Sequence, residues 1–517
     1  MIQMENRIVL VRFKDGCGPV GAWFLLLKAF VTNACGEHFE ASMLEEMNGR
    51  WPGCLSTTLS RRRDAFVAGF DYAGQHWLYF KGEIARSVPY SAEPRPRDTP
   101  VHGVPPRRCL MTGKTTAVTR PQQLWERLLR NAPMFILDVR NRDEFERWRV
   151  EGPHSVPTLN IPYFELLDLE GEEDVAEAVM RGVKAQLMAQ LPADRPILAV
   201  CAEGNTSGYV AEGLRRLGFD AANLEGGMAA WGGFYFWRPV EESERFSLYQ
   251  MVRPARGCLS HVLVSEHRAA VFDPARHIGI YRELAAALGA RIERALDTHL
   301  HADHLSGGPA LGQGDHIPYH LHPYDAIHPV DLLPARMAYR PLEAGQTLRI
   351  GRAEVRALHF PGHTLGMVAF LIEGRYLLSG DSLFLESVAR PDLGGKAEAW
   401  TPLLYESLKR MAELPDETVV LPAHFSDIAA GDENGVFRAT LGELKQRNPG
   451  LLKLAEGEKA FCDHILANLP LFPPAYVEIK RANAGLVSPD ERQAQELELG
   501  KNICAVGKTP APRPGMA

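Results

Sequence analysis

One run of eight residues, DTHLHADH at 297–304, constrains this chain more than any other feature of the sequence. It follows a short apolar segment whose composition is typical of a strand. In an extended backbone alternate side chains project to the same side, so His299 and His301 can face one ion. Asp303 and His304 then lie in the following turn and can face a neighbouring position. The run therefore predicts two adjacent metal positions at the end of a strand.

Three further metal-binding side chains occur downstream, each directly after a strand-like segment. They are His363 in FPGHT, Asp381 in LLSGD and His424 in LPAHF. Any one of them alone is more simply explained as a surface or core residue. Five histidines and two aspartates at successive loop tips, in contrast, are the nitrogen and oxygen ligands that a first-row divalent metal needs, and the set contains no thiolate. We therefore expect a metal centre.

With these seven residues the chain resembles the metallo-β-lactamase-fold superfamily over about residues 249–430. The resemblance implies an αββα sandwich, in which two sheets pack face to face between helices. Within the superfamily the HADH run, the PGHT segment and an RPD segment at 390–392 look most like the persulfide dioxygenase group and the neighbouring glyoxalase II group. The two groups differ in metal and in chemistry.

In the dioxygenases the resemblance implies one Fe(II) per chain, held by His299, His363 and Asp381, which leaves positions for O₂ and a thiol persulfide. The other four residues would then surround this site, orient its ligands and move protons: His301, Asp303, His304 and His424. In the hydrolases all seven residues bind two Zn²⁺, which activate hydroxide for attack on a thioester. The ligand residues alone do not distinguish these alternatives.

Arg390 has two interpretations. Its guanidinium can bind a carboxylate of a glutathione-like substrate through two parallel hydrogen bonds. It can equally form an internal salt bridge or be a solvated loop charge. Ala389 stands where the family usually has Gly, so the loop conformation is a point of difference.

Cys201 ends an apolar strand-like segment and begins the loop CAEGNTS, with a helix expected from about residue 208. A thiol in such a loop, facing backbone N–H groups and a helix N-terminus, is stabilised as a nucleophilic thiolate. The loop, the LDVRNRDEF segment at 137–145 and LEGGMAAW at 224–231 resemble a rhodanese domain over about residues 118–237. That resemblance implies an α/β domain with a parallel sheet, in which Cys201 accepts a sulfane sulfur and Asp138 and Arg140 stabilise the domain. Glu203 and Thr206 make the loop less cationic than one built for thiosulfate, which favours a thiol-borne sulfur donor. The alternative is a structural cysteine in a domain without activity.

We expect a multidomain protein, since 517 residues correspond to about three domains at roughly 150 residues each. We expect an N-terminal α+β module at 1–90 of unknown role, a proline-rich linker at 91–117, the rhodanese-like domain at 118–240, the metallo-β-lactamase-fold domain at 245–475 and a C-terminal tail at 476–517. In the first module, residues 8–13 and 76–80 are expected to be strands, and residues 22–31 and 41–47 helices. Cys258 and Cys504 are expected to have packing roles, and Cys504 would reach the metal only if the tail folded back.

Composition limits the partners. The 57 basic and 64 acidic residues give a formal net charge of −7, and no apolar stretch is long enough to span a bilayer, so neither nucleic acid nor a membrane is expected. The eight cysteines show no close pairs, and the N-terminus lacks the features of a signal peptide, which together predict a cytoplasmic protein. Whether the chain forms a homo-oligomer stays open.

A rhodanese-like domain beside a dioxygenase-like site gives a coherent route for sulfide oxidation. We therefore rank first a persulfide dioxygenase with a sulfurtransferase domain, acting with O₂ on the persulfide of glutathione or a similar thiol. A dinuclear zinc thioester hydrolase of glyoxalase II type ranks second. The third hypothesis is a non-catalytic sulfur-carrier or interaction protein, in which the N-terminal module recruits a partner.

Overall fold

The structure is a computed structural model. It describes the backbone of six strands between residues 3 and 86, with gaps between them, and residues 118–167 and 174–506 with their side chains. By internal contacts these residues form two compact units. One comprises the N-terminal strands with residues 164–167 and 174–190, and the other comprises residues 118–163 and 191–506. No described helix has both the length and the apolar composition that crossing a bilayer requires.

The N-terminal strands form two antiparallel three-stranded sheets, ordered β2-β1-β3 and β4-β5-β6. Their bounds are β1 Gln3–Phe13, β2 Trp23–Thr32, β3 Leu55–Thr58, β4 Ala68–Tyr72, β5 Gln75–Phe80 and β6 Glu83–Arg86. The strands expected at 8–13 and 76–80 are confirmed.

The helix expected at residues 22–31 is wrong, because this segment is strand β2. It pairs with β1 from Gln3↔Thr32 to Arg12↔Trp23. A short run that is apolar at nearly every position has no helical period, and pairing with a neighbouring strand then decides its conformation. The second expected helix, at 41–47, lies outside the described residues.

Strands and helices alternate in the rhodanese-like region, as the sequence predicts. Its sheet has the order β7-β11-β10-β8-β9, and every pair of neighbours is parallel. The elements are β7 Val118–Thr119, α2 Pro121–Leu129, β8 Phe135–Asp138, α3 Arg142–Arg147, β9 Thr158–Asn160, α4 Val175–Gln186, β10 Ile197–Val200, α5 Asn205–Arg216, β11 Ala221–Leu224 and α6 Gly227–Gly232. Val200 and Asp138 are register partners, so the carboxyl ends of β10 and β8 lie together.

Two mixed sheets form the metallo-β-lactamase-fold domain, with seven strands in the order β12 to β18 and six in the order β19 to β24. The first sheet contains β12 Phe236–Glu242, β13 Ser247–Arg253, β14 Cys258–Ser265, β15 Arg268–Phe272, β16 Arg291–Leu296, β17 Tyr319–Leu321 and β18 Arg340–Pro341. The second contains β19 Thr347–Ile350, β20 Ala353–His359, β21 Val368–Ile372, β22 Tyr376–Gly380, β23 Val419–Pro422 and β24 Ala439–Thr440.

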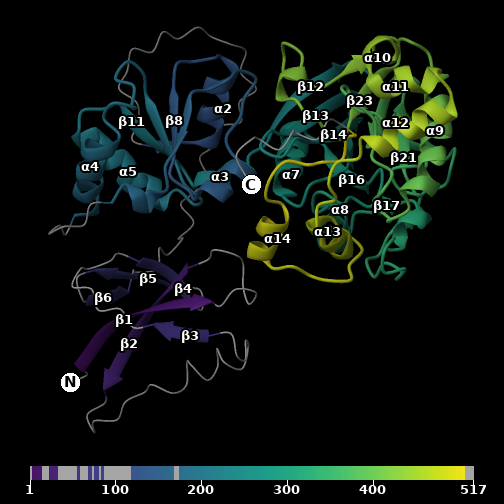
Figure 1. Ribbon diagram of the computed structural model, residues 1–517. Helices are drawn as coiled ribbons and strands as arrows, with labels where there is room; N and C mark the ends of the chain where they lie inside the picture. Colours follow the sequence, from purple (N-terminus) through teal and green to yellow (C-terminus); the bar gives the residue numbers. More distant parts are fainter. Residues whose placement is uncertain are drawn as a thin grey trace. The chain divides into compact units, whose positions relative to one another are not determined.

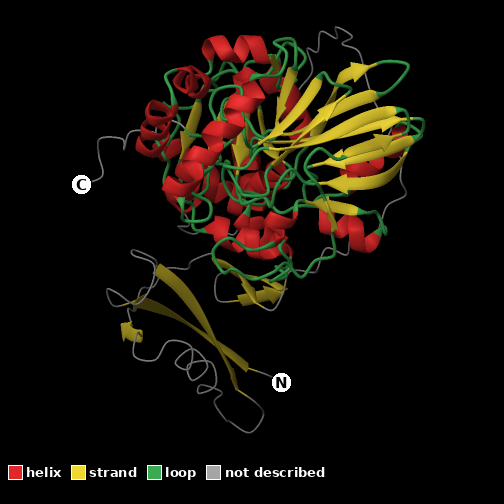
Figure 2. Ribbon diagram, turned by 90° about the vertical axis from the view of Figure 1, so that its right-hand side faces the viewer, coloured by secondary structure: helices red, strands yellow, loops and turns green. Residues whose placement is uncertain are grey.

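Helices cover both outer faces, which confirms the expected αββα sandwich (Figures 1 and 2). Helices α7 Gly279–Ala287 and α8 Gly308–Gly314 lie on the first sheet, and α9 Ala397–Ala412, α10 Leu441–Arg447, α11 Pro449–Ala455 and α12 Glu458–Ala467 lie on the second. Strand β21 shows the two-residue period of this packing. Val368, Phe370 and Ile372 face the core between the sheets, whereas Ala369 and Leu371 pack in the core of the helical layer.

The segment expected to be a C-terminal tail contains two more helices, α13 Ala475–Asn483 and α14 Glu491–Leu497. Tyr476, Ile479 and Ala494 are buried in apolar clusters with residues of the domain. These helices therefore belong to the packed structure, and they lie near α8 in Figure 1.

Candidate metal centre and sulfur-transfer site

All seven predicted metal-site residues lie at one edge of the sandwich. They follow β16, β20, β22 and β23, and each is at most 2% exposed. Gly380, at the end of β22, has a φ of +53°, and a Cβ there would lie 2.8 Å from Thr298 Oγ1. A glycine before Asp381 thus lets the two loops approach closely.

The first cluster consists of His299, His363 and Asp381. His299 Nε2 lies 3.7 Å and His363 Nε2 3.3 Å from Asp381 Oδ2. Within the described residues none of these three buried atoms has a hydrogen-bond partner. Buried polar atoms are normally paired, so three unpaired lone-pair donors around one point fit a cation.

The other nitrogen of each imidazole is occupied, which fixes the tautomer. Thr298 Oγ1 donates to Asp273 Oδ1 and therefore accepts from His299 Nδ1 at 2.9 Å. His363 Nδ1 donates to the carbonyl oxygen of Arg390 at 2.9 Å. Burial is the main cause that holds the pKa of His299 well below its usual value, so its Nε2 keeps a lone pair.

Asp381 is ionised in this setting. Burial alone would raise its pKa, but the imidazoles of His424 and His299 hold the pKa of this carboxyl well below its usual range. Its second oxygen, Oδ1, accepts a hydrogen bond from His424 Nδ1 at 2.6 Å.

His301 belongs to a different group, with Asp273 and Asp297. Its Nε2 lies 3.1 Å from Asp273 Oδ1 and 3.8 Å from Asp297 Oδ1, while its Nδ1 is buried without a hydrogen-bond partner among the described residues. Although burial lowers the pKa of His301, hydrogen bonds to Asp273 and Asp297 raise it well above its usual value.

The second cluster combines Asp303, His304 and His424 with Cys258, whose thiol the sequence interpretation did not include. Cys258 Sγ lies 3.5 Å from Asp303 Oδ2. Burial and Asp303 act to raise the pKa of this thiol, but the imidazoles of His424 and His304 outweigh them and lower it. No local motif marks Cys258, because it comes from a strand 45 positions before Asp303.

Residues of the C-terminal helices hold the loop that carries these ligands. Asn483 Nδ2 donates to the carbonyl oxygens of His301 and His304, both at 2.9 Å, and its Oδ1 accepts from Ser306 N. Glu498 Oε1 accepts from Leu305 N at 2.9 Å, and Lys480 Nζ donates to Leu300 O at 2.8 Å. Sequence reasoning missed these roles because it treated the segment as a tail.

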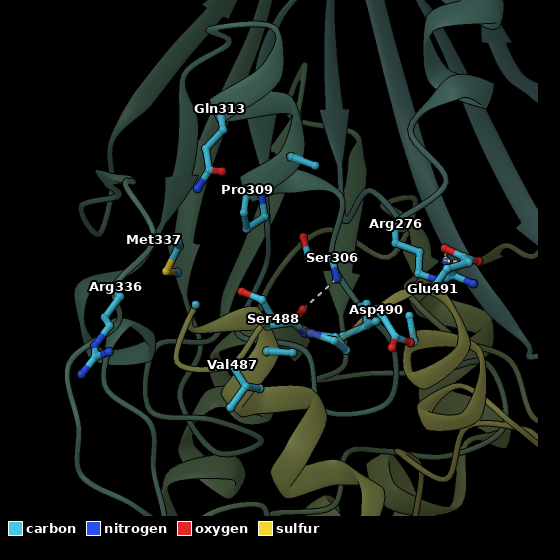
Figure 3. Close-up of a pocket in the computed structure, with 17 residues that line it drawn as sticks. Arg276, Ser306, Pro309, Gln313, Arg336, Met337, Val487, Ser488, Asp490 and Glu491 are labelled. Carbon is cyan, nitrogen blue, oxygen red and sulfur yellow. Dashed lines mark hydrogen bonds and ion pairs between the residues drawn. The ribbon is translucent and has the colours of Figure 1, made fainter. Parts of the chain in front are cut away.

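A surface pocket of about 450 Å³ lies between these helices and α8, lined by Ser306, Pro309, Arg336, Ser488 and Glu491 among others (Figure 3). A smaller pocket of about 230 Å³ is lined by Leu300 and Thr364, the neighbours of His299 and His363, and by Lys396 and Lys480. The smaller pocket thus contains chain neighbours of two first-cluster residues, although none of the seven metal-site residues lines either of these two pockets.

Arg390 is completely buried. Its guanidinium donates to both oxygens of Asp392, at 2.6 and 2.7 Å, and to three backbone carbonyls, those of Pro470, Leu471 and Ile503. All five N–H donors are thus used, and none is left for a substrate carboxylate. The structure gives the internal salt bridge, the second of the two interpretations.

The predicted sulfur-transfer loop places Cys201 directly after β10, at 5% exposure. Gly204 N and Ser207 Oγ donate to Cys201 Sγ at 3.1 and 3.2 Å. Gly204 adopts a φ of +86°, which turns the loop into helix α5. Two hydrogen bonds thus hold the sulfur at the N-terminus of this 12-residue helix.

Asp138 and Arg140 form a buried pair at the end of β8, with Arg140 Nη2 at 2.7 Å from Asp138 Oδ2. Arg140 also donates to the carbonyl oxygens of Glu144 and Trp148. The pair links β8 to helix α3, in agreement with the stabilising role that the resemblance implies.

Comparison with known proteins gives two family matches: a Rhodanese-like domain at residues 120–233 and the Metallo-beta-lactamase superfamily at residues 253–424. A "Hydroxyacylglutathione hydrolase" of Xanthomonas euvesicatoria pv. vesicatoria is 33% identical over 165 residues, which cover 32% of this chain and 58% of that protein. The "Persulfide dioxygenase ETHE1, mitochondrial" of Homo sapiens is 29% identical over 237 residues, which cover 45% of this chain and 84% of that protein.

Among solved structures, ETHE1 from Myxococcus xanthus is similar with a TM-score of 0.37 and 24% identity, over 48% of this chain and 99% of that one. A metallo-beta-lactamase from Staphylococcus aureus is similar with a TM-score of 0.40 and 23% identity, over 48% of this chain and 72% of that one. The two family matches, together with the αββα sandwich, show that the chain carries a rhodanese-like domain followed by a domain of the metallo-beta-lactamase superfamily.

Proposed function

We propose that the chain is a persulfide dioxygenase joined to a sulfurtransferase domain. It takes the persulfide of glutathione or a similar thiol and converts it, with O₂ and water, into the free thiol and sulfite. Among the relatives, one that this chain matches over 84% of its length bears the name persulfide dioxygenase. The rhodanese-like domain supports a sulfur substrate, because its cysteine loop is suited to carrying sulfane sulfur.

The first cluster carries the proposal. His299, His363 and Asp381 present two imidazoles and one carboxylate whose donor atoms have no hydrogen-bond partner among the residues that the structure describes. His301 is grouped instead with Asp273 and Asp297. Two histidines and one carboxylate are the set that non-haem Fe(II) oxygenases use. Fe(II) bound there would supply the redox chemistry that O₂ needs in order to react with a persulfide.

The surrounding residues orient the cluster and hold protons. Thr298 and Asp273 keep His299 in the tautomer that offers Nε2. His424 holds a proton on Nδ1 against Asp381 Oδ1, while its Nε2 lies 2.8 Å from Asp303 Oδ2. An imidazole between two carboxylates can take up or release a proton beside the reacting sulfur.

The pocket of about 230 Å³ is the proposed substrate position. Its apolar wall, which includes Leu365 and Trp400, suits a thiol substrate, and Lys396 offers a cation for a substrate carboxylate. Arg390 is not available for this contact, because its donors are used within the protein.

Cys201 supplies the second activity in this proposal. Its thiolate attacks the outer sulfur of a thiol-borne persulfide and becomes a persulfide, while the donor leaves as a thiol. A low-molecular-weight thiol then attacks the outer sulfur on Cys201, and Cys201 leaves as the thiolate. The product of this transfer is the substrate of the metal site, so one chain contains two consecutive reactions.

The test is metal analysis of protein purified without added metal, combined with oxygen-electrode measurements on glutathione persulfide. Iron in the protein, with O₂ consumption that depends on the persulfide, supports the dioxygenase. Thioester cleavage by a protein with two zinc ions, without O₂ uptake, would select the hydrolase. Two observations favour the hydrolase as the second candidate function. The chain has all seven ligand residues of a dinuclear site, and one relative at 33% identity bears the name hydroxyacylglutathione hydrolase.

A further inference from the structure

Asp325 is a buried carboxylate that bonds two of the loops that carry the predicted metal ligands. It belongs to the short 3-10 helix η2 Pro323–Ala326, which follows β17 and contains none of the seven predicted metal-site residues. The donors that surround it come from the loop after β16 and the loop after β20. Asp325 is thus a side chain from a third segment that contacts both loops.

One oxygen of Asp325 accepts hydrogen bonds from both loops. Oδ2 accepts from Leu300 N at 2.8 Å and from Thr364 Oγ1 at 2.7 Å. In the sequence Leu300 directly follows His299, and Thr364 directly follows His363. The carboxylate therefore holds the chain neighbours of both histidines of the first cluster.

The second oxygen adds another bond to the loop after β20. Asp325 Oδ1 accepts from Gly366 N at 2.7 Å. A Cβ at position 366 would lie 2.7 Å from Asp325 Cγ, so glycine is what lets the loop come this close. The three hydrogen bonds use both oxygens of the carboxylate, and its negative charge strengthens each of them.

A buried cation holds the other backbone group of Leu300. Lys480 Nζ, from helix α13, donates to Leu300 O at 2.8 Å, while Asp325 Oδ2 accepts from Leu300 N. Leu300 is thus fixed at its N–H and at its carbonyl oxygen by side chains of opposite charge. A shift of His299 would stretch one of these bonds, because the backbone joins the two residues.

The distance between the two histidines depends on such links. His299 follows β16 of the first sheet and His363 follows β20 of the second, and their ring centroids lie 4.9 Å apart. The main chain gives one link between the two loops, from Val368 N to Thr298 O at 2.8 Å. Ligands of one ion must be held to within about 0.5 Å of the productive geometry, and the three bonds of Asp325 add to this single main-chain link.

We propose that Asp325 is a positioning residue that sets the distance between the His299 and His363 imidazoles in the first cluster. Without its carboxylate the two loops lose their shared acceptor, and metal binds more weakly and in a changed geometry. The proposal rests on metal binding by the first cluster, as the proposed function does. It concerns the position of the ligands, so it holds for iron and for zinc alike.

Asp331 offers a matched control on the same side of the fold. Its carboxylate lies further along the segment after η2 and accepts from Arg481 Nε and Nη2, at 2.6 and 2.7 Å. These bonds join that segment to α13 and involve neither of the two ligand loops. Thr364 offers a second comparison, because Thr364→Val removes the hydroxyl donor at nearly constant shape and Thr364→Ser keeps it.

The experiment uses the full chain, stripped of metal with a chelator and titrated with Co²⁺, which can replace either iron or zinc. The d–d absorption of Co²⁺ reports the geometry of its ligands, and the part that His363→Ala removes belongs to the first cluster. In Asp325→Asn this part should shift in wavelength, and Co²⁺ should bind there about 10- to 100-fold more weakly. Thr364→Val should give a smaller effect of the same kind, whereas Thr364→Ser and Asp331→Asn should match the wild type.

Circular dichroism checks that each variant folds. Wild-type absorption and Co²⁺ affinity in a folded Asp325→Asn would overturn the proposal, and so would an equal change in Asp331→Asn. Where Asp325→Asn does not fold, Thr364→Val decides, and wild-type behaviour of that variant would overturn the proposal. If His363→Ala removes none of the absorption, the first cluster binds no metal and the proposed function fails together with this one.

Discussion

His301 Nε2 donates a hydrogen bond to Asp273 Oδ1 over 3.1 Å, so it is grouped with Asp273 and Asp297 and apart from His299 and His363. This relationship separates the two metal hypotheses. In a single-iron site His301 is a neighbour of the ligands, whereas in a dinuclear hydrolase it is itself a ligand.

We therefore expect His301→Ala to retain most of the iron of the first cluster, and His363→Ala to lose it together with O₂ uptake. The measurement is iron per chain by elemental analysis, with circular dichroism as the control for folding. Equal loss of metal in both variants would favour the dinuclear site.

Replacing Cys201 by Ser should abolish sulfur transfer, because the hydroxyl cannot carry a sulfane sulfur. Oxidation of preformed glutathione persulfide should continue, since this step needs only the metal site. Sulfur transfer from a persulfide donor and O₂ uptake are measured on the same preparation, with Cys462→Ser as the control. If both activities disappear together, the two sites are not independent.

Arg390→Ala should destabilise the protein by about 3 kcal/mol or more, because it breaks a buried ion pair and leaves three backbone carbonyls without their donor. Arg390→Lys should recover little, since an ammonium cannot reproduce the planar arrangement of donors. Thermal unfolding checks this, with the exposed Arg349→Ala as control. Unchanged stability with a raised KM would instead restore the substrate-binding interpretation.

Asn483→Ala should loosen the ligand loop, because one side chain serves three backbone groups of residues 301–306. The expected loss is about 3 kcal/mol of stability together with faster release of metal to a chelator. Asn483→Asp keeps the acceptor for Ser306 N and loses the two donors, so its effect shows how much the donors contribute. Metal release at the wild-type rate from both variants would contradict this role.

His261 gives the domain a defined acid sensitivity. It is buried beside Gln250, whose Nε2 lies 3.2 Å from His261 Nε2, and burial lowers the pKa of His261 to about 4. In the unfolded chain the imidazole takes up a proton near pH 6.5, which the folded protein resists until about pH 4. Stability is therefore present above pH 6.5 and falls as the pH drops towards 4, by up to about 3 kcal/mol. Chemical unfolding across this range should show a flatter profile for His261→Gln, and the exposed His267→Gln should behave as the wild type.

Much of the site could be predicted because its ligands lie in short local patterns. Histidines and aspartates that directly follow apolar, strand-like segments are predicted to lie at strand ends, where metal ligands are common. The structure brings three of them together, namely His299, His363 and Asp381. Cys258, Asn483 and Glu498 carry no such local signal, because their roles depend on segments that meet only in the folded domain. The strand at residues 23–32 was missed for the same reason, since its partner strand decides its conformation.

Asn483 and Glu498 are synthesised after every predicted metal ligand, and yet they hold the loop from which three of those ligands project. During synthesis the ligands therefore emerge before the groups that fix their positions. We expect stable metal binding to begin only once helices α13 and α14 have left the ribosome and packed, so that cofactor loading is a late step in the maturation of this chain.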